Sequence, residues 1–104
     1  MTVVEPRPLV VLAEDHQDTR DLYAWHLSTL GFLVTEARDG HEALQRAREC
    51  EPDVMVMDLS LPVLDACQVI RRLQTEAPTR RIPIIGLNGY GFFQHSLAAL
   101  SAGC

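Results

Sequence analysis

The sequence predicts an α/β protein in which helices cover both faces of a parallel sheet. Residues 9–13 and 53–58 are mostly apolar runs without polar alternation, which is typical of strands buried on both faces. Segments with the spacing of amphipathic helices follow these runs. Strands that alternate with helices imply parallel pairing and right-handed crossovers. A chain of 104 residues has the length of one domain, and we expect residues 1–104 to form it, with residues 1–7 as a short leader.

The first half of the chain continues with a helix, a strand and a second helix. Residues 18–30 have helical spacing, and five side chains are expected on the inward face of this helix: Leu22, Tyr23, His26, Leu27 and Leu30. Gly31 supplies a left-handed stop, and a short strand follows at residues 32–36. Asp39 caps the next helix, and Glu42, three residues later, completes a capping box.

The second half repeats this alternation. The strand at residues 53–58 precedes a helix that Asp65 is expected to cap, with an inner face formed by Val69, Ile70 and Leu73. A fourth strand is expected at residues 82–87 and a fourth helix at residues 92–102. The sequence therefore predicts four βα units.

Composition excludes several function classes. The net charge of −5 argues against nucleic-acid binding by this chain alone, because phosphate backbones repel a negative surface. The apolar runs are too short to span a bilayer, and no secretory signal is visible, so we expect a cytoplasmic protein without membrane contact. The three cysteines are widely spaced and are expected to be free thiols: Cys50, Cys67 and Cys104.

Three carboxylates follow the apolar strands. Glu14 and Asp15 come directly after the first strand, and Asp58 ends the third. If these strands are neighbours, the acids converge at one sheet edge, where their repulsion requires a cation. Oxygen ligands in this number suit Mg²⁺, and a carboxylate beside the ion can attack phosphorus to form an acyl phosphate. Any one of these acids alone is more simply a helix N-cap; the three together favour a functional site at the switch point of the sheet.

At these residues the sequence resembles the receiver domain of bacterial two-component response regulators. The resemblance covers roughly residues 8–104 and is carried by segments 10–15, 30–32, 39–44, 52–58, 61–65, 81–87 and 102–104. It implies a doubly wound, flavodoxin-like sheet with strand order 2-1-3-4 and with the family's fifth βα unit missing from the chain.

The resemblance also implies roles for individual residues. Asp58 resembles the phosphoacceptor, which takes a phosphoryl group from a histidine kinase or a histidine phosphotransfer protein and also contacts Mg²⁺. Asp15 resembles the direct Mg²⁺ ligand, Glu14 the acid that acts through water, and the backbone carbonyl of Ser60 the third protein ligand. The expected output is a changed surface near the fourth helix, read by an output domain or a partner protein. Such a domain is a signalling phosphoacceptor and not a metabolic enzyme.

Two departures from the family pattern leave alternatives open. Asn88 occupies the position of the switch Ser or Thr, and the sequence contains no Lys, although the family has one at the end of its fifth strand. We expect a C-terminally truncated receiver, with a homodimer or a domain swap as the next interpretation. The first functional alternative is a pseudo-receiver, a protein-interaction module that does not use phosphorylation. The second is an enzyme on the same fold, which the absence of a nucleotide-binding glycine motif opposes.

Overall fold

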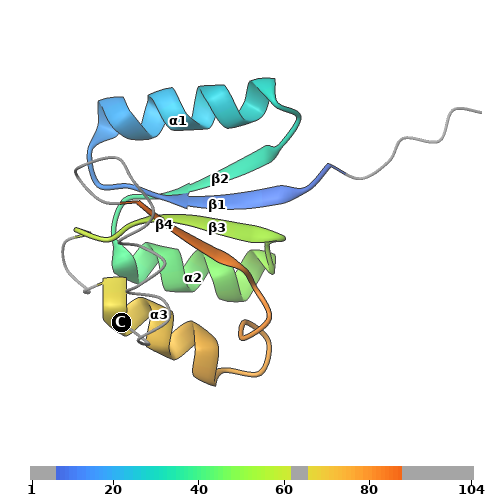
Figure 1. Ribbon diagram of the computed structural model, residues 1–104, viewed down its shortest axis with the longest axis vertical. Helices are drawn as coiled ribbons and strands as arrows, with labels where there is room; N and C mark the ends of the chain where they lie inside the picture. The colour runs from blue at the N-terminus through green and yellow to red at the C-terminus, as the bar shows by residue number, and fades with distance from the viewer. Residues whose placement is uncertain (1–6, 62–65, 88–104) are drawn as a thin grey trace, which may run out of the picture.

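Strand β1 (Leu9–Ala13) lies inside a parallel sheet of four strands, between β2 (Leu33–Ala37) and β3 (Val54–Asp58), and β4 (Ile84–Leu87) pairs with β3 on its far side (Figure 1). The structure is a computed structural model that describes residues 7–61 and 66–87. Its order, β2-β1-β3-β4, confirms the expected parallel topology.

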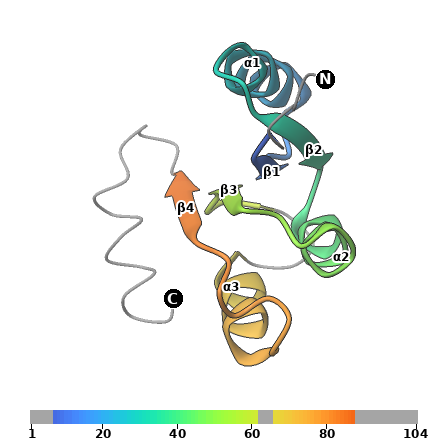
Figure 2. The same ribbon diagram turned by 90° about the vertical axis from the view of Figure 1, so that its right-hand side faces the viewer.

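The main core lies between the sheet and two of the three described helices. Helices α2 (Gly40–Cys50) and α3 (Ala66–Thr75) cover one face of the sheet, and α1 (Gln17–Thr29) covers the other (Figure 2). The buried side chains between sheet, α2 and α3 include Val11, Ala13, Ala43, Leu44, Ala47, Met55, Met57, Val69, Ile70 and Leu73. Residues expected on the inner face of the third helix are thus buried, as predicted.

The inward face expected for α1 is wrong. None of the residues of this helix is buried, and Leu22 and Leu30 are 60% and 63% exposed. Tyr23 and His26 are exposed as well, and Leu27 is half-buried. Among the described residues, α1 is the sole helix on its side of the sheet, so the described part of the chain provides no second helix to cover its apolar flank (Figure 2). Helical spacing identifies an apolar flank but not its partner.

Local hydrogen bonds explain where several elements begin. Gly31 has a φ of 99°, and the amides of Gly31 and Phe32 donate to the carbonyls of Ser28 and Leu27, the arrangement of a Schellman motif. The amide of Phe32 is therefore used in the C-terminal cap of α1, and β2 begins at Leu33, one residue later than expected.

The cap of α2 has the expected bond from Glu42 to Asp39, but the reciprocal bond comes from the residue before the cap. The Asp39 carboxylate accepts a hydrogen bond from the amide of Glu42 at 2.8 Å. Glu42, in turn, accepts from the amide of Arg38, the residue before the cap, at 2.9 Å. The helix ends before Glu51, which has a φ of 45°.

The third and fourth strands begin later than the sequence suggests. Asp53 lies outside β3, and its carboxylate accepts a hydrogen bond from the amide of Leu9 at 2.7 Å. Ile82 lies outside β4 because its amide donates to the carbonyl of Thr79 in the turn after α3.

Some expectations fall on residues that the structure does not describe. These are residues 1–6 of the leader, the Asp65 cap, Asn88 and the fourth helix at residues 92–102, all outside the described residues. Among the described cysteines, Cys50 is a free thiol, whereas Cys67 is disulfide-bonded. The expectation of free thiols is wrong for Cys67, because spacing along the chain does not reveal which thiols the fold brings together. No helix of the described chain has the length and apolarity needed to cross a membrane.

Candidate functional site

Three carboxylates meet at the carboxyl ends of β1 and β3. Glu14 and Asp15 follow the last residue of β1, and Asp58 is the last residue of β3. Since Ala13 pairs with Met57, the next residues of the two strands lie at the same level of the sheet. One carboxylate oxygen from each acid lies within 4.8 Å of the others. The structure thus brings together all three acids that the sequence singles out.

The acids differ in their surroundings. Glu14 is 6% exposed and Asp58 is 8% exposed, whereas Asp15 is open to solvent. The amide of Glu14 donates to the carbonyl of Ala37 at 3.0 Å, which holds the residue against the end of β2. Two acids are therefore fixed in the protein, and the third lies at the mouth of the cluster.

Ser60 holds the Asp58 carboxylate in one orientation. Asp58 Oδ1 accepts a hydrogen bond from the amide of Ser60 at 3.0 Å and another from its hydroxyl at 2.8 Å. Ser60 is exposed. The resemblance implies a role for the backbone carbonyl of this residue. The structure adds its amide and hydroxyl as donors to Asp58, which the sequence does not reveal.

The electrostatics of the cluster favour a positively charged guest. Burial raises the pKa of Glu14 to about 7, and the charges of Asp58 and Asp15 add to this rise. A hydrogen bond from the amide of His16 to Glu14 Oε1, at 3.2 Å, acts in the opposite direction and lowers the pKa. A cation bound among the three acids would relieve both the repulsion and the cost of a buried charge.

The donor set fits a hard divalent cation. It consists of oxygen atoms alone, which Mg²⁺ prefers, and an exposed member leaves room for the water molecules that this ion retains. Between described residues, the ion pairs use the carboxylates of Glu36, Glu42, Glu49 and Glu76. None of these pairs neutralises the three acids.

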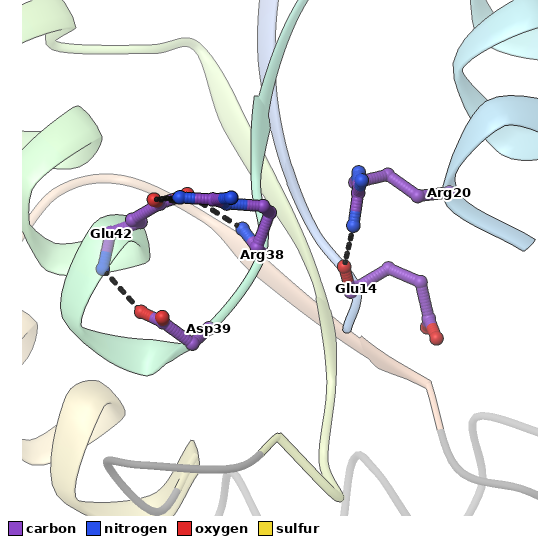
Figure 3. A network of polar contacts seen from close by, with 5 residues as sticks. All are labelled: Glu14, Arg20, Arg38, Asp39 and Glu42. Atoms are coloured by element: carbon purple, nitrogen blue, oxygen red, sulfur yellow. Dashed lines mark hydrogen bonds and ion pairs between the residues drawn. The ribbon is translucent and has the colours of Figure 1, made fainter. Parts of the chain in front are cut away.

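Arg20 contacts the site from behind, and sequence analysis did not single it out. Its Nη1 donates to the main-chain oxygen of Glu14 at 3.0 Å, while the Glu14 carboxylate extends in another direction (Figure 3). Its Nε lies 3.3 Å from Glu36 Oε1. A side chain that binds a main-chain carbonyl leaves no signal in residue types, because every residue offers that acceptor.

Comparison with known sequences gives one consistent family. The profile described as "Response regulator receiver domain" matches residues 10–104. Among curated relatives, the transcriptional regulatory protein PrrA of Mycobacterium tuberculosis is 37% identical over 101 residues, which are 97% of this chain and 42% of PrrA. The polar-differentiation response regulator DivK of Brucella ovis is 28% identical over 95 residues, or 91% of this chain and 77% of DivK. The chain thus spans about two fifths of the length of PrrA.

Comparison with solved structures agrees. The chemotaxis response regulator CheY4 of Vibrio cholerae has a TM-score of 0.83 at 22% identity, with 94% of this chain and 81% of that chain covered, and supports the fold. The receiver domain of the sensor histidine kinase PA1611 of Pseudomonas aeruginosa has a TM-score of 0.82 at 28% identity, with 95% and 80% covered. That structure holds a magnesium ion in its active-site cleft. Because the family profile matches nearly the whole of this chain and both neighbours share its fold, this chain belongs to the response regulator receiver domain family.

Proposed function

We propose that this chain is a phosphoacceptor domain in which Asp58 receives a phosphoryl group from the phosphohistidine of a histidine kinase or a histidine phosphotransfer protein. The observation that carries the proposal is the convergence of Glu14, Asp15 and Asp58 within 4.8 Å at the ends of adjacent strands. Helix caps do not explain why three acids meet at one place, whereas a site for a divalent cation and a phosphoryl group does.

In the proposed reaction, a carboxylate oxygen of Asp58 attacks phosphorus. A P–O bond forms, giving an acyl phosphate, and the P–N bond to the donor imidazole breaks. The electron pair of that bond remains on the imidazole nitrogen, which takes a proton from solvent. The two hydrogen bonds from Ser60 to Oδ1 fix the plane of the carboxylate before the attack.

Glu14, Asp15 and Asp58 would hold Mg²⁺, with the backbone carbonyl of Ser60 as a further ligand. When bound, the ion supplies positive charge to the oxygens of the transferred group. Glu14 is buried beside two other acids, so a bound cation would compensate its charge, and the exposed Asp15 leaves the site accessible to the donor.

The proposed partners follow from this reaction. The phosphoryl donor docks over the carboxyl ends of β1 and β3, where the acids lie. The signal would pass to an output domain or a partner protein through the surface near the fourth helix, which lies outside the described residues. Asn88, the expected switch position, is also outside the described residues.

One observation favours a second candidate function. Asn88 replaces the hydroxyl residue of the family pattern. A receiver without this hydroxyl would act as a phosphorylation-independent protein-interaction module. The three converging acids favour the phosphoacceptor over this alternative.

Incubation with acetyl phosphate and Mg²⁺, followed by intact-protein mass spectrometry, tests the proposal. We expect the chain to gain the mass of one phosphoryl group, and Asp58→Asn to gain none. Asp53→Asn is the matched control, because Asp53 precedes the same strand at its opposite end; this variant should be labelled like the parent. A parent chain that stays unlabelled at saturating donor and Mg²⁺ would reject the phosphoacceptor and favour the interaction module.

A further inference from the structure

Arg20 joins two strand ends through one guanidinium group. It is the fourth residue of α1, and its side chain is only 11% exposed. Nη1 donates to the Glu14 carbonyl at 3.0 Å, and Nε pairs with Glu36 Oε1 at 3.3 Å. The side chain thus ties the start of α1 to the residue after β1 and to β2.

The Glu14 carbonyl lies where the sheet ladder ends. The amide of Glu14 still bonds to the carbonyl of Ala37, and after this residue the chain turns toward α1. Since Glu14 is almost fully buried, its carbonyl needs a partner inside the protein, and Arg20 provides one. The segment closed by this contact, residues 14–20, carries both Glu14 and Asp15.

The contact between Arg20 and the Glu14 carbonyl fixes where the acids lie and does not neutralise their charge. Figure 3 shows the guanidinium at the main-chain oxygen of Glu14, with the Glu14 carboxylate directed elsewhere. The charge of Arg20 is paired with Glu36. Two acceptors are bound by two different nitrogen atoms of a planar group, an arrangement that the single ammonium of a lysine does not reproduce.

We propose that Arg20 is a positioning residue for the acidic cluster. By holding the main chain at Glu14, it sets the places of the Glu14 and Asp15 carboxylates and so the affinity of the cluster for a divalent cation. This inference rests on the proposed function, because it assigns a supporting residue to the same cation site. Partners that orient metal ligands without touching the metal typically change affinity by about 10- to 100-fold.

A positioning role and a charge role of Arg20 predict opposite effects on Mg²⁺ binding when this residue is neutralised. If Arg20 acted only through its charge, its neutralisation would strengthen Mg²⁺ binding, since a positive group near the acids would be lost. If it acts through position, neutralisation weakens binding because the two carboxylates are no longer held in place.

The experiment is a titration of the isotope-labelled chain with Mg²⁺ alone, followed by the amide NMR signals of residues 14–17. We expect Arg20→Gln to weaken Mg²⁺ binding by about tenfold. Arg20→Lys keeps the charge and should not restore it. The matched control is Arg38→Gln, which removes an exposed arginine paired with Glu42 and should bind within about twofold of the parent. Hydrogen exchange at the amide of His16 should be faster in both Arg20 variants without metal.

The outcomes separate the two proposals. Folded Arg20 variants that bind Mg²⁺ as tightly as the parent, or more tightly, would overturn the positioning role and leave the proposed function intact. A parent chain that binds no Mg²⁺ would overturn both. If Arg20→Gln does not fold, Arg20→Lys decides the question alone, because it keeps the charge and most of the side-chain packing.

Discussion

Glu14 directly follows β1 and Asp58 ends β3, and their carboxylate oxygens lie within 4.8 Å of each other, with both residues nearly buried. The pairing of β1 with β3 causes this proximity, since the residues after Ala13 and Met57 emerge side by side. Two carboxylates in such a place oppose each other's ionisation. The cation-free fold is therefore less stable than it would be with one charge fewer.

Neutralising one acid should stabilise the cation-free protein. We expect Asp58→Asn to raise the free energy of unfolding by on the order of 1 kcal/mol at pH 8, because the repulsion of Glu14 is relieved. Asn keeps the oxygen that accepts from Ser60. Urea unfolding in EDTA measures the change. Asp53→Asn should bring no gain, since Asp53 accepts a hydrogen bond from Leu9; a less stable Asp58→Asn would contradict the repulsion.

The pKa of Glu14 predicts a pH dependence of stability. In the unfolded chain this carboxyl titrates near its ordinary pKa of 4.5, and in the folded chain near 7, mainly because it is buried. Between these values the folded state binds more protons, so the contribution of Glu14 to stability falls as the pH rises from 4.5 to 7 and is constant above. Unfolding in EDTA at pH 5 and pH 8 should show a smaller loss in Glu14→Gln than in the parent. Equal losses would show that Glu14 does not titrate in this range.

The two faces of the sheet should respond differently to truncation of leucine. Leu44 is 2% exposed in the core, and Leu22 is 60% exposed on α1. We expect Leu44→Ala to cost about 3 kcal/mol of stability and Leu22→Ala to stay within about 0.5 kcal/mol. Thermal and urea unfolding of the two variants, at several protein concentrations, provide the comparison. A large loss in Leu22→Ala would mean that another surface covers α1 in solution.

The cap of α2 offers a test of a single hydrogen bond. Asp39 accepts from the amide of Glu42 at 2.8 Å, so Asp39→Ala should cost about 1 kcal/mol. Asp39→Asn keeps an accepting oxygen and should cost much less, which separates the hydrogen bond from the charge. Chemical denaturation of both variants is the measurement. If the two losses were equal, the charge at the helix start would be the dominant effect.

The sequence predicts the acidic cluster better than it predicts the packing of the neighbouring helix α1. Acids at the ends of apolar strands are visible in the sequence, and parallel pairing necessarily gathers them at one edge of the sheet, as Glu14 and Asp58 show. The exposure of Leu22 could not be foreseen, because an apolar flank does not state what packs against it. The role of Ser60 as a donor to Asp58 and that of Arg20 at the Glu14 carbonyl depend on side-chain directions that exist only in the folded chain.

The late start of β2 has a similar origin. Gly31 correctly marks the end of α1, but the amide of Phe32 is still used to close the helix. An apolar residue directly after a helix stop can belong to the helix or to the strand, and its hydrogen bond decides. The sequence does not show this bond.

The central place of β1 restricts how the length of this strand can vary in evolution. Val10 pairs with Val34 on one side and Val54 on the other, and Ala13 pairs with Ala37 and Met57. A single inserted or deleted codon in this strand would turn every later side chain of β1 to the opposite face of the sheet. It would also carry Glu14 away from Asp58. Insertions are therefore expected to be tolerated in the connecting loops of related chains and eliminated from β1.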